Sequence, residues 1–332
     1  MAGLGLTTER VDVTQLTPLL FLERSADVFP DKVAITYGET HTTYSEMADA
    51  TQAAAAGLAA VGVGQGDRVA YLMPNLPEML IGHFAVPLLG AVLVAINTRL
   101  AGAEIAYILD HSGSRVLVAD TALLPAVIPH LESCPGLELV VQLADEAPVM
   151  DLDSATVAYA EMVAEGGGTR RPWRVDDELS PISIYYTSGT TGRPKGVQYT
   201  HRGAHLNSLA ELLHSEHSPD SVYLWTLPMF HCNGWCTTWA ITAFGGRHVC
   251  LRDVDPAEIW RLIGAEGVTH LNGAPTVLVS LANSLEAAPF GRPFTITTAG
   301  APPSPTIIGA MERLGARMIH VYGLTETYGP YT

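Results

Sequence analysis

Residues 182–196 read Ile182-Ser183-Ile184-Tyr185-Tyr186-Thr187-Ser188-Gly189-Thr190-Thr191-Gly192-Arg193-Pro194-Lys195-Gly196, an apolar strand followed by a loop of hydroxyls, glycines and one lysine. Such a loop can surround phosphate oxygens with backbone N–H groups, hydroxyls and an ammonium. It differs from the Walker loop, because its lysine follows a proline and a strand-like segment comes next instead of a helix. An ordinary flexible turn is the alternative, but the density of phosphate-binding groups favours a phosphate loop.

Strand-like and helix-like segments alternate on both sides of this loop. The segments with strand character are Val33–Tyr37, Arg68–Leu72, Val92–Ile96, Arg115–Ala119, Leu137–Gln142, Ile182–Tyr186, Val222–Trp225, His248–Leu251, Val268–Leu271, Phe294–Thr298 and Arg317–Val321. This alternation predicts an α/β fold with two successive doubly wound, mostly parallel sheets and flanking helices. We expect a first subdomain over residues 1–180 and a second over residues 181–332. Ligands of such folds bind beyond the carboxyl ends of the strands.

Local signals place several other elements. Thr43 and Glu46 form a capping-box pattern at the start of an Ala-rich helix. Asn75 is expected to cap the next helix. Leu123–Leu131 has a helical pattern that two prolines interrupt, and residues 144–177 lose the alternation and are expected to form a linker or a long surface loop.

The composition argues against several classes of protein. Apolar residues make up 48% and charged residues 16% of the 332 residues, which fits strands buried on both faces and not a disordered chain. The formal net charge of −16 argues against nucleic-acid binding. Met79–Ile96 is apolar enough to be tested as a membrane span, but His83, Pro87 and Gly90 favour a buried helix followed by a strand.

The four cysteines are too few for a disulfide framework in a chain of this length. Reduced thiols, and an N-terminus without a basic region before an apolar run, predict a cytoplasmic location. Cys232 and Cys236 could form a metal cluster with His231, yet no second pair of ligands follows them. Buried reduced thiols are therefore the better interpretation.

Two further strings follow predicted strands. They are Leu227-Pro228-Met229-Phe230-His231-Cys232-Asn233-Gly234-Trp235 and Tyr322-Gly323-Leu324-Thr325-Glu326-Thr327. At the end of a strand, Glu326 could hold Mg²⁺ and Thr325 could contact a phosphate. Taken singly, each residue has an ordinary alternative, because His231 could be a hydrogen-bonded core histidine and Glu326 a solvated loop carboxylate.

Together and in this order, the three strings resemble the adenylate-forming superfamily, which includes acyl-CoA synthetases, the adenylation domains of peptide synthetases and luciferases. The string around His231 is most similar to the branch of fatty- or aryl-acid CoA ligases. The segments Leu72-Met73-Pro74-Asn75 and Asn97-Thr98-Arg99-Leu100 agree with that branch, and the resemblance covers nearly the whole chain. It implies that a carboxylate attacks the α-phosphate of ATP to give an acyl-adenylate and pyrophosphate. Coenzyme A then displaces AMP.

The resemblance also implies a role for each residue of these strings. Lys195, His231, Thr325 and Glu326 would be catalytic, with Thr325 on the α-phosphate, Glu326 on Mg²⁺ and His231 beside the path of the thiol. The β- and γ-phosphates would lie against Lys195 and against Thr187, Ser188, Gly189, Thr190, Thr191 and Gly192. Adenine would lie against Gly300, Ala301, Pro302, Tyr322 and Gly323. The acid would lie against Asn233, Trp235, Gly273, Ala274 and Pro275, with Trp235 as the gate of an acyl pocket in the second subdomain.

The chain departs from this family in two respects. It stops at Thr332, before the C-terminal domain that carries the family's adenylation lysine, so we expect the large N-terminal part of a ligase that turns over poorly alone. Ala299 stands where the family often has glycine, and its methyl group is expected to weaken ATP binding. Two alternatives remain open: a half-enzyme that binds acid or acyl-adenylate without adenylating, and an enzyme that loads a carrier protein instead of coenzyme A.

The expected partners are a small carboxylic acid and its acyl-adenylate, with no nucleic acid and no membrane span. Amino-acid-selecting relatives place an aspartate soon after the position of Phe230, and no carboxylate occurs there in this chain. An acid with an uncharged, hydrophobic tail is therefore expected. Trp235, Trp239 and Phe244 suit such a tail, although packing of a helix core would explain them equally well.

Overall fold

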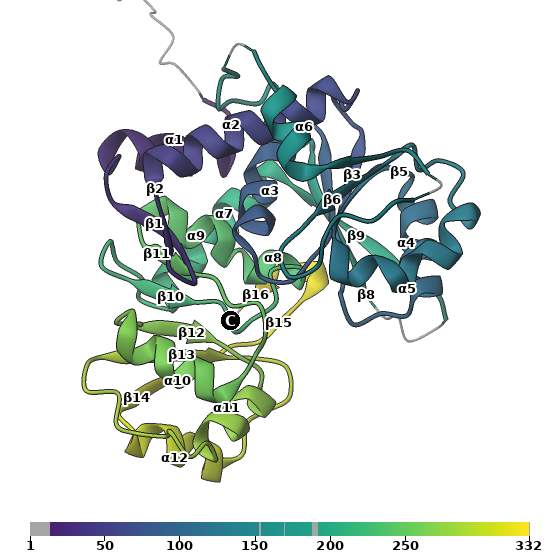
Figure 1. The fold of residues 1–332 in the computed structure, drawn as a ribbon. Coiled ribbons are helices and arrows are strands. Elements are labelled where there is room, and N and C mark those ends of the chain that lie inside the picture. The colour runs from purple at the N-terminus through teal and green to yellow at the C-terminus, as the bar shows by residue number, and fades with distance from the viewer. Residues whose placement is uncertain (1–13, 153, 169, 188–191, 332) are drawn as a thin grey trace, which may run out of the picture.

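Two seven-stranded sheets with helices around and between them make up the computed structural model (Figure 1). The structure describes residues 14–152, 154–168, 170–187 and 192–331. Each large sheet is parallel except for one hairpin at its edge, which confirms the predicted α/β class. A small antiparallel pairing joins β15 (Gly323–Leu324) to β16 (Gly329–Pro330).

The first large sheet has the strand order β7-β6-β5-β3-β4-β8-β9. Its strands are β3 (Arg68–Leu72), β4 (Val92–Ala95), β5 (Ser114–Asp120), β6 (Leu139–Leu143), β7 (Thr156–Ala158), β8 (Pro181–Thr187) and β9 (Lys195–Thr200). The central strands β3, β4 and β5 are nearly continuous runs of buried residues. Such runs are typical of parallel strands that helices cover on both faces.

The second large sheet has the strand order β14-β13-β12-β10-β11-β1-β2. Its strands are β1 (Val33–Tyr37), β2 (Thr40–Thr43), β10 (Val222–Leu224), β11 (Arg247–Val249), β12 (His270–Asn272), β13 (Phe294–Thr298) and β14 (Ala316–His320). The carboxyl ends of β12, β13 and β14 lead into the segments that the sequence analysis singled out for ligand binding.

The chain crosses between the two large sheets twice. It starts the second sheet with β1 and β2, builds the whole first sheet from β3 to β9, and returns to the second sheet at β10. The sheets therefore change between β2 and β3 and again between β9 and β10, whereas the predicted boundary at residues 180 and 181 falls just before β8. Local patterns identify a strand but do not reveal which sheet it joins.

The helices cover the faces of both sheets. They are α1 (Leu19–Val28), α2 (Tyr44–Ala60), α3 (Pro77–Leu88), α4 (Gly102–Ser112), α5 (Leu124–Val127), α6 (Tyr159–Glu165), α7 (His201–His214), α8 (Cys232–Trp235), α9 (Thr237–Phe244), α10 (Pro256–Ala265), α11 (Pro275–Ala282) and α12 (Pro305–Arg313). Short 3-10 turns are η1 (Thr121–Leu123), η2 (Ile128–Ser133) and η3 (Thr325–Thr327). The expected capping box of Thr43 and Glu46 is present at the start of α2.

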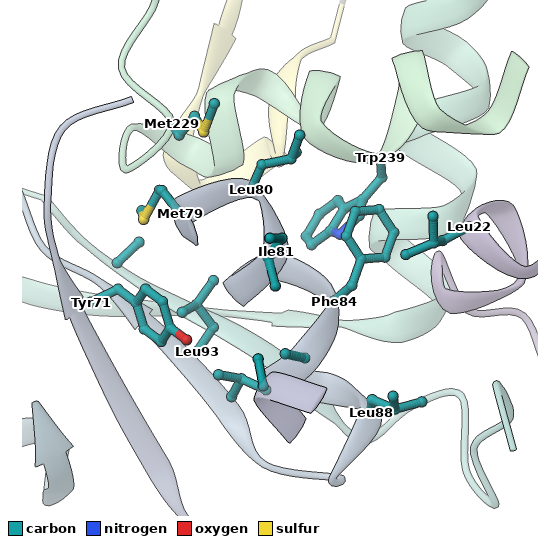
Figure 2. Packing of buried hydrophobic residues seen from close by; sticks show 14 of the residues in the cluster. Leu22, Tyr71, Met79, Leu80, Ile81, Phe84, Leu88, Leu93, Met229 and Trp239 are labelled. Carbon is teal, nitrogen blue, oxygen red and sulfur yellow. The ribbon is translucent and has the colours of Figure 1, made fainter. Parts of the chain in front are cut away.

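Helix α3 lies in the hydrophobic core that joins the two sheets, as Figure 2 shows. Ten of its twelve residues are buried, which explains the apolar run that resembled a membrane span. Phe84 faces Trp239 of α9 and Leu22 of α1, while Tyr71 of β3 and Leu93 of β4 pack on the other side of the helix. Among the helices in the described ranges, none is both long and apolar enough to cross a bilayer.

The expected loop over residues 144–177 contains regular structure. Strand β7 pairs in parallel with β6, and α6 packs against α2. The amide of the buried Gln142 bonds both the N–H and the carbonyl of Met150 at 2.8 Å and the hydroxyl of Thr156 at 2.7 Å. A Cβ at Gly57 of α2 would approach the carbonyl oxygen of Met162 within 2.4 Å. The hydrogen bonds of Gln142 in β6 therefore fix this segment, and the absence of a side chain at Gly57 lets α6 pack closely against α2.

The predicted helix over Leu123–Leu131 is divided into η1, α5 and η2. Pro125 and Pro129 each lack a backbone N–H and restrict the residue before them. The segment is thus helical in short pieces, and the prediction of one continuous helix is wrong.

Candidate functional site

The phosphate loop connects two antiparallel strands at the edge of the first sheet. β8 ends at Thr187 and β9 begins at Lys195, and the two residues are partners across the hairpin. Gly192 has a φ angle of +131°, which residues with a side chain rarely adopt. The predicted phosphate-binding residues Ser188, Gly189, Thr190 and Thr191 lie outside the described residues.

A cavity of about 350 Å³ lies beside this hairpin and brings the three predicted strings together. Thr187 and Gly192 line it from the phosphate loop, His231 lines it from the segment before α8, and Thr325 lines it from η3. The remaining lining comes from Ala95, Asn97, Leu100, Glu104, Ile108, Tyr185, Tyr186, Pro194, Phe230 and Cys232. The cavity lies at the carboxyl ends of β4 and β8, which is where parallel sheets bind ligands.

A smaller cavity of about 160 Å³ shares His231, Cys232 and Thr325 with the first. Its other lining residues are Trp235, Ala299, Gly323, Leu324, Gly329 and Pro330. Two larger surface hollows, of about 810 and 510 Å³, lie along the β6–β7 edge and around Arg68 and Pro172. Neither is lined by a predicted site residue, so the two smaller cavities define the candidate site.

The ring of His231 is exposed to the cavities just before the start of α8. Surrounding atoms that remove hydration, and then the positive charge of Arg99, lower the pKa of His231. The imidazole is therefore neutral near pH 7. A neutral ring can exchange hydrogen bonds with an anionic ligand and with an incoming nucleophile without changing the charge of the site.

The short turn α8 has a left-handed backbone. The φ angle is +51° at Cys232, +53° at Gly234, +59° at Trp235 and +63° at Cys236. Positive φ costs free energy at residues that have a Cβ, so the surrounding structure must impose it. A Cβ at Gly234 would lie 2.4 Å from the ring of Trp225, and this close approach requires glycine.

The left-handed turn brings the indole of Trp235 into the wall of the smaller cavity. Only 6% of this residue is exposed, and it packs with Leu227, Ala299 and Val321. Trp235 is thus a buried residue in the wall of the smaller cavity, and its role as a gate stays a prediction. The side chain of Asn233 lies outside the parts that the structure describes.

Thr325 and Glu326 lie in η3, directly after β15. The thiol of Cys232 donates a hydrogen bond to the hydroxyl oxygen of Thr325 over 3.2 Å. Burial, and to a smaller extent the negative charge of Glu326, raises the pKa of the Cys232 thiol, so the thiol remains protonated as a donor. The carboxylate of Glu326 itself is exposed.

An exposed carboxylate could help to hold Mg²⁺ if a phosphate were bound nearby, because Mg²⁺ takes one or two carboxylates together with phosphate oxygens and water. Within the described ranges, no group of three or more His, Cys, Asp or Glu residues could hold a metal ion by itself. The alternative of a metal cluster at His231, Cys232 and Cys236 is therefore not found.

The remaining predicted residues, apart from Gly323, do not line either of the two cavities. Lys195 is exposed at the start of β9, and Tyr322 is 60% exposed after β14. Two strings follow neighbouring strands: Gly273, Ala274 and Pro275 after β12, and Gly300, Ala301 and Pro302 after β13. Ala299, which directly precedes Gly300, lines the smaller cavity.

Asn75 has a role that the sequence reasoning missed. Helix α3 has Leu76 as its N-cap, without a side-chain cap. The buried amide of Asn75 instead donates to the carbonyls of Trp225 and Leu227 at 2.9 and 3.0 Å and accepts from the N–H of Met229 at 2.7 Å. These three bonds hold the segment that leads to His231. The only sequence signal for them is that Asn75 belongs to the string Leu72-Met73-Pro74-Asn75, which matches the resembled family.

Comparison with known proteins agrees with this geometry. Residues 22–332 match the family model described as AMP-binding enzyme. The chain belongs to the AMP-binding enzyme family. The match spans all three strings that meet at the cavity of about 350 Å³.

The AMP-binding chain is similar to several curated CoA ligases. 4-Hydroxybutyrate–CoA ligase 2 of Metallosphaera sedula is 42% identical over 321 residues, which cover 96% of this chain and 58% of that relative. The peroxisomal butyrate–CoA ligase AAE11 of Arabidopsis thaliana is 38% identical, with 95% of this chain and 57% of the relative covered. The AMP-binding chain therefore spans less than two thirds of the length of these relatives.

Solved structures share the fold. The inhibitor-bound N-terminal domain of FACL13 from Mycobacterium tuberculosis superposes with a TM-score of 0.84 at 27% identity, and the match covers 95% of this chain and 77% of that one. The anthranilate–CoA ligase AuaEII in complex with anthranoyl-AMP has a TM-score of 0.86 at 20% identity over 96% of this chain and 62% of that one. The second likeness supports the fold alone.

Proposed function

We propose that the chain is the nucleotide- and acid-binding part of an AMP-forming carboxylate–CoA ligase. The observation that carries this proposal is the cavity shared by Thr187, His231 and Thr325, which come from strings far apart in the sequence. The relatives named as ligases of 4-hydroxybutyrate and butyrate support coenzyme A as the acceptor. ATP, Mg²⁺ and coenzyme A are the corresponding cosubstrates and cofactor.

The proposed reaction has two steps. A carboxylate oxygen of the acid bonds to the α-phosphorus of ATP, and pyrophosphate leaves with the electrons of the broken P–O bond. The sulfur of coenzyme A then bonds to the acyl carbon, its thiol proton is released to solvent, and AMP leaves with the electrons of the broken C–O bond. Because the attacking carboxylate is already ionised at neutral pH, the site must position the reactants and neutralise charge, and no general base is needed.

Each group of residues has a proposed part in these steps. Lys195 and the loop residues Thr187, Ser188, Gly189, Thr190, Thr191 and Gly192 bind the β- and γ-phosphates. The hydroxyl of Thr325 donates a hydrogen bond to the α-phosphate. Glu326 would hold Mg²⁺, which would supply positive charge beside the phosphates. His231 remains neutral beside the path of the thiol. Tyr322 and Gly323, with Gly300, Ala301 and Pro302, bind adenine; the exposed ring of Tyr322 is free to stack on it.

The acid that fits this site best is small and hydrophobic. The cavity next to Trp235 measures about 160 Å³, and its walls carry no carboxylate. We place the acyl group there, against Trp235 and near Asn233 and Gly273-Ala274-Pro275. The small volume favours a short or compact acid over a long fatty acid.

A reducing compartment is part of the same proposal. All four cysteines are free and buried. We therefore propose a cytoplasmic location, which cell fractionation would test, and peroxisomal recovery would contradict it.

Lys195→Ala tests the phosphate assignment. Hydrogen bonds to charged groups contribute about 1.5–3 kcal/mol, so the variant should bind Mg·ATP about tenfold or more weakly. Its affinity for butyrate should stay within about twofold, because the acid lies at the other cavity. Titration calorimetry on the 332-residue chain measures both values.

Arg261→Ala is the matched control, since it removes the same charge from an exposed pair with Glu258 on α10. It should leave both affinities unchanged. Equal losses of ATP and acid binding in Lys195→Ala would contradict the assignment of the loop. Failure of the unaltered chain to bind Mg·ATP and acyl-adenylate mimics would contradict the proposed function itself.

A further inference from the structure

The turn that carries Thr325 and Glu326 is attached to the return strand of the phosphate hairpin. Tyr199 of β9 is fully buried, and its hydroxyl donates a hydrogen bond of 2.6 Å to the carbonyl oxygen of Thr325. The two residues are 126 positions apart in the chain. Tyr199 lines neither cavity, and it reaches the candidate site through Thr325 and through the neighbouring thiol of Cys232, which lines both cavities.

The other end of the turn is held by the same strand and by α7. The rings of Tyr199 and Tyr328 stack with their centres 4.0 Å apart. The hydroxyl of Tyr328 accepts the backbone N–H of Thr200 at 2.9 Å, and Asn207 donates to the carbonyl of Tyr328 at 3.1 Å. Gly203 makes room for this ring, because a Cβ there would lie 2.3 Å from its atoms.

Strand β9 thereby connects two parts of the site. It begins with Lys195, and Tyr199 follows four positions later on the same face of the strand, because side chains alternate. At about 3.3 Å per residue, the two Cα atoms are roughly 13 Å apart along a stiff hydrogen-bonded strand. The side chain of Tyr199 therefore ties the turn with Thr325 and Glu326 to the strand that begins at Lys195.

We propose that Tyr199 is a positioning residue of the adenylate site, which fixes Thr325 and Glu326 relative to Lys195 through its hydrogen bond to the Thr325 carbonyl. This inference rests on the proposed function, since it assumes that Thr325 contacts the α-phosphate. It predicts that loss of the Tyr199 hydroxyl impairs binding at the α-phosphate and spares binding at Lys195.

The test is Tyr199→Phe, with AMP and Mg·pyrophosphate as two separate probes. We expect the dissociation constant of AMP to rise about tenfold and that of pyrophosphate to stay within about twofold. A purely structural role would change both affinities together or neither. Tyr71→Phe is the control, because Tyr71 is fully buried and its hydroxyl has no hydrogen-bond partner in the described ranges. It should leave AMP binding unchanged.

Gly203→Ala disturbs the Tyr328 end of the turn that carries Thr325 and Glu326, and it leaves both tyrosines in place. Its methyl group should displace the ring of Tyr328 and again weaken AMP more than pyrophosphate. Gly264→Ala on α10 is the matched control, since a Cβ there meets nothing within 4 Å.

Calorimetric titration with AMP and with Mg·pyrophosphate distinguishes three results that would contradict the positioning role of Tyr199 or the proposed function. Unchanged AMP affinity in Tyr199→Phe would refute the positioning role. Equal losses for AMP and pyrophosphate in that variant would refute it as well, because they indicate general loosening of the fold. Absence of binding of both probes by the unaltered chain would refute the proposed function first and the positioning role with it.

Discussion

At the scale of single residues, the site depends on side chains that bridge segments distant in sequence. Asn75 makes three hydrogen bonds to the segment before His231, and Tyr199 makes one to Thr325. Neither side chain lines the two cavities, although both hold residues that do. Sequence patterns identified His231 and Thr325, because these belong to recognisable strings. They did not identify the supporting roles, because a hydrogen bond between distant segments leaves no local pattern.

Asn75→Ala should destabilise the chain by about 2–4 kcal/mol, since it removes three buried hydrogen bonds worth about 1 kcal/mol each and leaves their partners unsatisfied. Urea denaturation measures this loss. Asn283→Ala provides the comparison, because Asn283 is exposed and makes a single bond to the carbonyl of Val279. It should cost no more than about 0.5 kcal/mol. Similar small losses in both variants would show that Asn75 does not hold the segment.

At the scale of elements, α8 decides the shape of the candidate acid pocket. Nothing in the residue types of the string from Phe230 to Trp235 indicated a left-handed turn, in which Cys232, Trp235 and the following Cys236 have positive φ. The turn exists because its surroundings impose it: Trp225 packs against Gly234, and the wall of the smaller cavity buries Trp235. Backbone conformation here follows packing and not local propensity.

Trp235→Ala should widen the range of acids that bind. Removal of the indole from the wall of the smaller cavity leaves room for longer tails, so acyl-adenylate mimics from acetyl to octanoyl should show a shift of preference toward longer chains. The variant should also lose about 3–5 kcal/mol of stability, as buried Trp→Ala changes do.

Trp260→Ala separates these two effects. Trp260 is 8% exposed on α10, and it packs in the separate core cluster of the second sheet. Its loss of stability should be similar, while the preference among acyl chains should not change. An unaltered preference in Trp235→Ala would remove the gate from the proposed function.

At the scale of the whole molecule, burial keeps several histidines uncharged. Burial lowers the pKa of His83, His201 and His270 to about 4 and that of His248 to about 3. The unfolded chain, in which histidine has a pKa near 6.5, therefore binds more protons than the folded chain between pH 4 and 6.5. Burial also raises the pKa of Glu211 to about 7, and this acts in the opposite direction.

The free energy of unfolding should fall steeply as the pH decreases from 6.5 to 5. Each of the four histidines contributes about 1 kcal/mol per pH unit, and His217, whose pKa burial also lowers, adds a similar amount. Glu211 and Glu78, whose carboxyl pKa values burial raises, offset part of this sum, so the net slope is about 3–4 kcal/mol per pH unit. Urea denaturation at several pH values measures it. His83→Leu removes one titrating group and should make the slope shallower by about 1 kcal/mol per pH unit. A stability that does not change over this range would contradict the burial of these rings.

The sequence by itself determined the class of the fold, most strands and the three strings that meet at the candidate site. These features follow from hydrophobic periodicity, capping residues and strings at strand ends, which depend on neighbours in the chain. Only the tertiary structure decided which sheet β1, β2, β8 and β9 join, that β7 and α6 replace an expected loop, and that α8 turns left-handed. It also decided that Tyr199 and Asn75 hold Thr325 and the segment before His231. Each of these depends on contacts between residues distant in the chain, whose free energy no local pattern records.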